Sequence, residues 1–247
     1  MAYGKENYQA DSYLLTKVEL FSDKLVEGAS VRLERVVSDI DIYEHLDKPY
    51  LTADIIILDN AGLFDQVDLI GGERIEISFK RPDTECKEIT KLFVIQKINT
   101  SAKVSDQADV ISFKLVESIA FTSVALNVNR SYNGRPYDII NNILSEYLDK
   151  KLSDDNPTHQ NKLKLIVPNM SPLKACEWIK DRAVSEDGLP FYLHSSLVKD
   201  ELNFIDLGSL LVDNSPFRFP YNYTLTMSDY SKTENQLTDS YNILKYD

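Results

Sequence analysis

The side chains with nucleophilic chemistry are cysteines and histidines that lie far apart along the chain. Cys176 lies among apolar residues at helical spacing, whereas His45, His159 and His194 are scattered over the 247 residues. A histidine activates a cysteine when the two meet in the folded protein, so distance in the sequence does not exclude such a pair. A cysteine on the apolar face of an amphipathic helix, however, usually packs as a small hydrophobic side chain. We therefore expect Cys176 to be a core residue.

Carboxylates form two pairs whose spacing suits metal binding or acid–base catalysis. Asp39 and Asp41 lie two residues apart, which places both on one face of a strand, and Asp154 and Asp155 are adjacent in a polar segment. Neither pair has the ligand spacing of a calcium loop, and aspartate is mostly exposed in folded proteins. Glu73 directly follows two glycines, a pattern that a turn leading into a strand explains. We expect surface charge at the four aspartates and a turn at Glu73.

Other chemical signals are weak. Arg130 and Arg135 flank Tyr132 in a short basic segment, which gives little support for polyanion binding. Trp178 lies beside Cys176 on another helix face, where we expect a packing or interface anchor. The motifs GxSxG, HExxH, GxxxxGKS/T and CxxC are all absent from the sequence. We predict no catalytic, cofactor-binding or metal-binding residues, no cofactor and no enzyme activity.

Composition limits the partners. The chain carries 27 Lys and Arg against 39 Asp and Glu, a formal charge of -12. This balance disfavours a broad nucleic-acid surface and an anionic membrane, because both require clustered cations. The first residues show no secretory signal, and no apolar run approaches the length of about 18 residues that spans a membrane. With Cys86 and Cys176 too far apart for a disulfide framework, we expect a protein made in a reducing cytoplasm, with no membrane anchor.

The first half of the chain has the period-2 pattern of strands. Strict alternation predicts strands at residues 15–21, 31–36 and 73–80, and a continuously apolar stretch at 52–58 predicts a strand covered on both faces. Two longer β segments at 88–98 and 110–121 are joined by a polar stretch, 99–109, that we expect to be a loop. One short helix is expected at 63–69. Six or so closely spaced strands predict a closed or nearly closed antiparallel barrel.

The second part contains two helix patterns and a hairpin pattern. Pro136 is suited to a helix start, and an apolar stripe follows it towards Lys150. Ser171 and Pro172 predict the start of a second helix, with Gly188 just past its end. The inner face of this helix is expected to contain Leu173, Cys176, Ile179 and Ala183. The two strands of the hairpin are expected at residues 189–193 and 201–207.

These patterns predict a mainly β protein with an α+β second part. An antiparallel β-barrel is expected over residues 1–125, and an α+β unit with two helices and a β-hairpin over residues 126–222. Residues 223–247 are expected to begin a further, incomplete β region.

The order of these segments resembles the baseplate hub proteins of contractile-tailed phages, whose architecture is shared with type VI secretion spike proteins. In the first half, an apolar strand ends in Asp59-Asn60, and a short segment leads to Gly71-Gly72-Glu73 and the next strand. In the second half, the similar segments are the helix from Ser171 to Gly188, the hairpin at 190–193 and 202–206, the small-residue–Leu segment 208–210, and residues 239–242.

The resemblance implies a structural virion protein of the tail baseplate, assembled in the host cytoplasm. Its tube-like barrel is expected to line the DNA passage without specific DNA binding. Its expected partners are two further copies in a homotrimer, a tail-tube or tube-initiator protein above and a trimeric spike protein below. Two other classes stay open: a carbohydrate-binding β module that stacks sugars on exposed Tyr and Trp, and a peptidoglycan hydrolase that uses two carboxylates.

Overall fold

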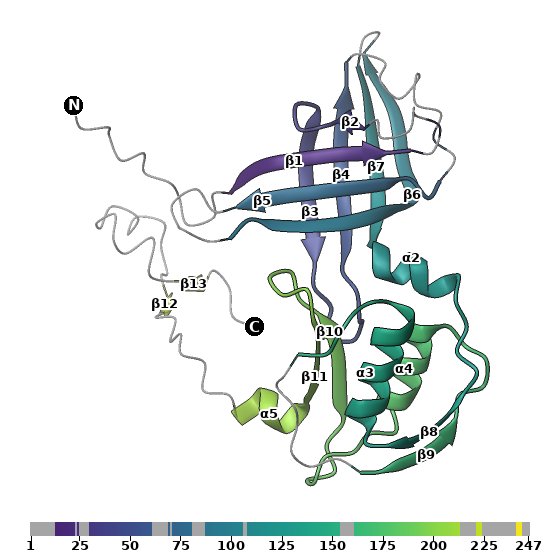
Figure 1. Ribbon diagram of the computed structural model, residues 1–247. Coiled ribbons are helices and arrows are strands. Elements are labelled where there is room, and N and C mark those ends of the chain that lie inside the picture. Colours follow the sequence, from purple (N-terminus) through teal and green to yellow (C-terminus); the bar gives the residue numbers. More distant parts are fainter. Residues whose placement is uncertain are drawn as a thin grey trace.

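The computed structural model describes residues 13–22, 24, 30–60, 69, 71–80, 87–105, 108–153, 161–212, 221–223 and 241–243. They form a mainly β protein with a smaller α part, as predicted. A curled antiparallel sheet encloses one hydrophobic core, and an α/β unit beside it encloses a second (Figure 1). The helix predicted at 63–69 lies outside the described residues, apart from Leu69. Asp154, Asp155 and His159 also lie outside them.

Seven strands form the curled sheet in the order β2-β1-β5-β6-β7-β4-β3, and every neighbouring pair is antiparallel. The strands are β1 Leu14–Phe21, β2 Val31–Arg32, β3 Val37–Tyr43, β4 Thr52–Asp59, β5 Arg74–Lys80, β6 Ile89–Ser105 and β7 Ala108–Glu117. The long strand β6 pairs with β5 through its first half and with β7 through its second half. As a result, β1 and β5 run across β3, β4 and β7 (Figure 1).

The two edge strands of the sheet, β2 and β3, are consecutive in the chain. The N–H of Leu33 donates to the carbonyl of Val18 in β1 at 2.8 Å, and the N–H of Leu58 in β4 donates to the carbonyl of Val36 at 2.8 Å. One short segment therefore bonds to both sides of the curled sheet. The prediction of a continuous strand at 31–36 is wrong, because the chain turns between Leu33 and Val36.

Two further predictions for the sheet are corrected. The expected loop at 99–109 is mostly strand, because the backbone of β6 pairs with β7 as far as Ser105. The expected burial of β4 on both faces is also wrong: Ile55 and Ile57 are buried, but Ile56 and Leu58 are each 37% exposed. Strand β4 thus has an outward face that contains apolar side chains.

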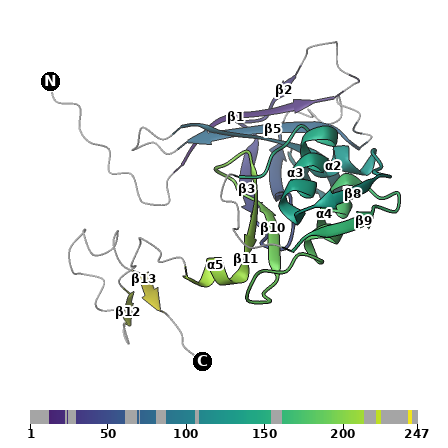
Figure 2. The ribbon, with the colours of Figure 1, turned by 60° about the horizontal axis from the view of Figure 1, so that its bottom comes forward.

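The α/β unit follows β7 directly. Its elements are α2 Ser118–Val124, β8 Ser131–Gly134, α3 Pro136–Tyr147, β9 Leu163–Ile166, α4 Pro172–Lys180, β10 Phe191–Ser195, β11 Leu202–Asp206 and α5 Leu207–Val212. Helices α3 and α4 lie between the β8–β9 ribbon and the β10–β11 hairpin in both views (Figures 1 and 2). Beyond α5, β12 Tyr221–Tyr223 and β13 Tyr241–Ile243 form a short parallel pair.

Helix α3 begins at Pro136, as predicted, and buries its apolar stripe. Helix α4 begins at Pro172, but it ends at Lys180, so the predicted end near Gly188 is wrong. Gly188 has a φ of 75° in the turn that precedes β10, a conformation that favours glycine. The predicted cap at Ser171 makes no side-chain hydrogen bond, and the free N–H of Leu173 instead donates to the hydroxyl of Ser123 in α2 at 2.9 Å.

The β segment predicted at 110–121 is also corrected, since its last residues form α2. The side chain of Ile119 belongs to the core of the α/β unit, so the chain passes from one core to the other immediately after Glu117.

Candidate functional site

The junction between the curled sheet and the α/β unit is built around a buried carboxylate. Glu117, at the end of β7, is 6% exposed. Its carboxylate accepts the N–H of Leu51 at 2.9 Å and the hydroxyl of Ser195 in β10 at 3.3 Å. Its own N–H donates to the carbonyl of Leu51 at 3.0 Å. One side chain therefore connects β7, the segment before β4 and the β10–β11 hairpin.

A buried cation holds the tip of the same hairpin. Lys91, in β6, is 6% exposed, and its Nζ donates to the carbonyl oxygens of Ser196 at 3.2 Å and Lys199 at 3.1 Å. The carboxylate of Glu44 accepts the N–H of Leu197 in that tip. Because ionised donors and acceptors make the stronger hydrogen bonds, these contacts fix the hairpin tip against the sheet.

Leu197 completes the junction with an apolar contact. Its side chain packs against the core of the curled sheet and lines a cavity of about 210 Å³. The other lining residues come from β1, β3 and β5 or the residue before β1: Tyr13, Leu15, Ile40, Ile42, Ile77 and Phe79. The described lining of this cavity is thus apolar apart from the hydroxyl of Tyr13.

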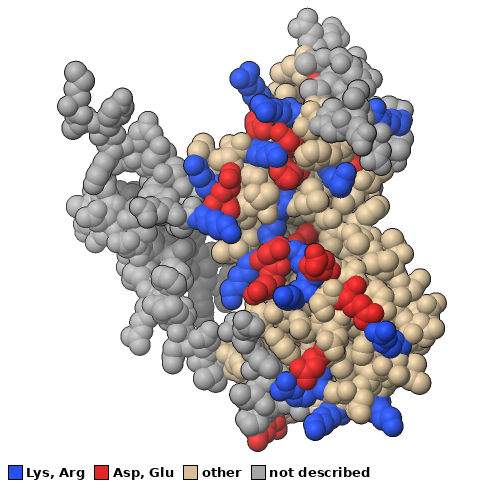
Figure 3. Space-filling view, in the orientation of Figure 1, with Lys and Arg blue, Asp and Glu red and all other residues tan. Residues whose placement is uncertain are grey.

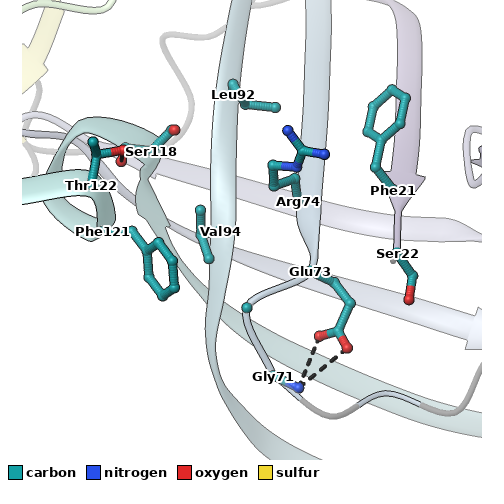
Figure 4. A pocket seen from close by; sticks show the side chains of 11 residues that line it. Phe21, Ser22, Gly71, Glu73, Arg74, Leu92, Val94, Ser118, Phe121 and Thr122 are labelled. Carbon is teal, nitrogen blue, oxygen red and sulfur yellow. Dashed lines mark hydrogen bonds between the residues drawn. The ribbon is translucent and has the colours of Figure 1, made fainter. Parts of the chain in front are cut away.

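A second cavity, of about 440 Å³, lies between the start of β5 and α2 (Figure 4). The N–H of Gly71 donates to both carboxylate oxygens of Glu73, at 3.2 and 3.0 Å, which agrees with the predicted turn. Gly71 and Gly72 have φ values of 92° and 86° there. Phe121 of α2 lines the opposite wall (Figure 4). Among the described lining residues, Glu73 has the one carboxylate, and it is hydrogen-bonded within its own turn.

The candidate nucleophile lies in the core. Cys176 is fully buried in α4, and burial raises the pKa of its thiol. His45 Nε2 lies 2.7 Å from the hydroxyl of Thr52, and His194 is half-buried in β10 with an enclosed Nδ1 that has no hydrogen-bond partner. Neither of these two histidines is hydrogen-bonded to Cys176 in the described structure.

The charged candidates lie on the surface. Asp39 and Asp41 are both exposed on one face of β3, as predicted, and Asp39 accepts the N–H of Ile40 at 3.0 Å. Arg130 pairs with Glu146 at 2.7 Å, so its charge is compensated. Arg135 likewise pairs with Asp138, at 2.8 Å. Within the described ranges, no group of three or more His, Cys, Asp or Glu residues is arranged to hold a metal ion.

Trp178 is partly buried against the core of the α/β unit, which agrees with its predicted packing role. The guanidinium of Arg182 lies 3.8 Å from the centre of its ring, and the same group donates to the Trp178 carbonyl at 2.7 Å. One face of the indole ring is therefore covered by a cation.

Sequence reasoning missed the two buried charges of the junction, although a signal was present. Glu117 is in phase with the inward residues Phe113 and Leu115 of β7, and Lys91 is in phase with the inward Phe93 of β6. A charged residue in the inward phase of a strand indicates a buried polar contact.

No protein-family model matches the chain, and no curated protein matches its sequence. The structure is similar to that of the 43 kDa tail protein of prophage MuSo2 from Shewanella oneidensis, with 11% identity and a TM-score of 0.46, over 88% of this chain and 60% of that one. It is also similar to a component of the E. coli type VI secretion system, with 13% identity and a TM-score of 0.41, over 77% and 53% of the two chains.

A third similar structure is a prophage tail protein from Listeria monocytogenes, with 10% identity and a TM-score of 0.34, over 76% of this chain and 50% of that one. The chain thus spans 60% or less of the length of each of these three proteins. They come from phage tails and a type VI secretion system, the assemblies that the sequence resemblance names. None of the helices in the described ranges is long and apolar enough to cross a membrane.

Proposed function

We propose that this chain is a structural subunit of a phage tail, in the baseplate hub that joins the tail tube to the central spike. One observation supports this role above the others. A curled antiparallel sheet is fastened through Glu117 and Lys91 to an α/β unit, in the chain order that the resemblance to hub proteins implies.

The proposed hub is a homotrimer that contacts a tube or tube-initiator protein above and a trimeric spike below. It is assembled in the host cytoplasm and has no catalytic role. The chemical groups described above agree with this role, because the carboxylates and cations of the junction bind backbone groups of the same chain.

We propose further that DNA passes along the chain without binding to it. The net charge of -12 repels a polyanion and offers few phosphate contacts. We expect fluorescence anisotropy to show no complex with duplex DNA at about 0.15 M salt. Binding of DNA at this ionic strength would contradict the proposal. We also expect DNA ejection to slow when carboxylates on the strands that face the DNA passage are replaced by basic residues.

The location of the chain in the particle tests the hub role. An epitope inserted in the exposed turn at residues 186–188 would be labelled with gold-conjugated antibody in purified tails and viewed by electron microscopy. We expect label at the baseplate end, where the tube meets the spike, and none on untagged particles. Label along the tube or on fibres would contradict the hub role, and label on fibres would favour the carbohydrate-binding alternative.

A further inference from the structure

One row of charged residues crosses the outer face of the curled sheet in an unusual order. Cross-strand partners place Asp41 of β3 opposite Asp54 of β4, Asp54 opposite Lys114 of β7, and Lys114 opposite Lys97 of β6. Partners in register share one face of a sheet. The row therefore has two carboxylates at one end and two ammonium groups at the other.

The charges of this row have opposite partners only at its centre, where Asp54 lies opposite Lys114. Like charges directly opposite each other destabilise a sheet, and the row contains two such pairs, Asp41 with Asp54 and Lys97 with Lys114. Among the described residues no ion pair joins Asp54 to Lys114, and Oδ1 of Asp54 is enclosed without a hydrogen-bond partner. The row thus leaves electrostatic energy that an outside partner can lower.

On β1 and β5 the like-charged partners Glu19 and Glu76 are instead bridged by a cation. There Lys17 of β1 lies 3.2 Å from Glu19 and 2.5 Å from Glu76 of β5, and Arg32 lies 3.7 Å from Glu19. Cations and carboxylates are also interspersed over the face shown in Figure 3. Among the described residues, no such bridging ion pair is found in the row Asp41–Asp54–Lys114–Lys97, which we call the charge row.

The acidic end of the charge row lies beside Tyr43, the last residue of β3. Partial burial raises the pKa of Tyr43, and the carboxylates of Asp41, Asp54 and Asp39 raise it further. A negative potential therefore extends over the end of β3.

The acidic end of the charge row lies at an edge of the sheet, and the basic end lies on β6, an inner strand that pairs with β5 through its first half only. Strand β3 has a partner only in β4. Beyond Ile95, which bonds to Gly72 and Glu73, β6 is paired on its β7 side alone among the described residues. Strands β3, β4, β7 and β6 alternate in direction, so β6 of a second copy laid beside β3 would continue the antiparallel order.

We propose that the charge row joins copies of this chain head to tail, the acidic end on β3 and β4 of one copy facing the basic end on β6 and β7 of the next. The partner is a second copy of this chain, because the two lysines at one end of the row are complementary in charge to the two aspartates at its other end. Head-to-tail contacts close into a ring when the rotation between neighbouring copies allows it. This inference rests on the proposed homotrimer, and it identifies a contact that fixes how neighbouring copies are aligned.

Charge reversal tests the proposal. Variant A carries Asp41→Lys and Asp54→Lys, variant B carries Lys97→Asp and Lys114→Asp, and a third variant carries all four changes. The control for variant A is Asp187→Lys with Glu201→Lys, two exposed residues of the α/β unit that change the net charge equally. Light scattering behind a sizing column gives the mass over a wide concentration range, and circular dichroism checks that each variant is folded.

We expect variants A and B each to weaken self-association about tenfold or more, equivalent to about 1.4 kcal/mol. The variant with all four changes is expected to assemble again, because its row is reversed at both ends, and the control is expected to assemble as the wild type does. The role of the charge row, but not the trimer, would be overturned if the folded variant with all four changes stays monomeric or if variants A and B assemble as the wild type does. A wild-type chain that is monomeric at every concentration would overturn the trimer, and the row with it.

Discussion

Burial decides the chemistry of Cys176, whose thiol is enclosed in the core of the α/β unit with a raised pKa. Because thiolate is the reactive form, a raised pKa and lack of access both slow alkylation. In a Cys86→Ser background, we expect Cys176 in the native chain to react with a maleimide at least about a hundredfold more slowly than in urea-unfolded chain. Mass spectrometry over time measures this, and rapid native labelling would restore a reactive role for the thiol.

His194 predicts a pH dependence of stability. Burial lowers its pKa from the ordinary value of 6.5, and the carboxylate of Glu44 partly opposes this effect. The folded chain then binds this proton less readily than the unfolded chain does. The contribution of neutral His194 to stability is therefore full above pH 6.5 and is lost as the pH falls through this value towards the lower pKa of the folded state.

The matched variant His194→Asn removes that titration. We expect the free energy of unfolding of the wild type, measured in urea between about pH 7.5 and 5, to fall more steeply with decreasing pH than that of the variant. Parallel curves for the two proteins would show that His194 titrates alike in the folded and unfolded chains, contrary to this prediction.

At the scale of elements, α4 depends on a cap from another helix. The Ser123 hydroxyl accepts the N–H of Leu173, whereas Ser171 makes no side-chain cap. Ser123→Ala should lower the free energy of unfolding by about 1 kcal/mol, and Ser171→Ala by a few tenths at most. Urea unfolding of both variants checks this, and equal losses would contradict the assignment of the cap.

The junction between the sheet and the hairpin gives a larger expected effect. Glu117→Ala leaves the N–H of Leu51 without an acceptor and removes the partner of the Ser195 hydroxyl. A buried donor without a partner costs about 1–3 kcal/mol, so we expect a loss of this size, and a smaller one for Glu117→Gln, which keeps a carbonyl acceptor. Differential scanning calorimetry measures both, and an unchanged Glu117→Ala would contradict the role of this carboxylate.

Periodicity predicted the elements that bury one face, such as β1, β5, α3 and the β10–β11 hairpin. It failed where the pattern continued through a change of structure. Leu33 keeps the alternation of β2, although the chain turns directly after it, and Ile119 keeps that of β7 although it lies in α2. The residues at 99–105 are strand because their backbone finds a partner in β7, which polarity does not reveal.

The junction was less predictable than the strands that carry it. The phase of Glu117 and Lys91 indicates burial, but their partners are 66 to 108 positions away in the chain. Such partners are chosen by the packing of two units, which no local pattern specifies. The prediction that the chain has no catalytic residues, by contrast, used residue types and spacing alone.

The whole molecule has two hydrophobic cores joined by buried charges, in a chain of net charge -12. Self-association of such an acidic chain must overcome repulsion between copies, which falls as salt is added. Local pairing of opposite charges, as in the charge row, is one way to overcome this repulsion and also to favour one register of contact.

The mass of the purified chain in solution tests whether it forms the proposed homotrimer. Light scattering behind a sizing column, over a wide range of concentration, is expected to give three times the monomer mass of 28.2 kDa. A trimer agrees with a hub subunit that matches a trimeric spike. A mass of 28.2 kDa at every concentration would contradict it.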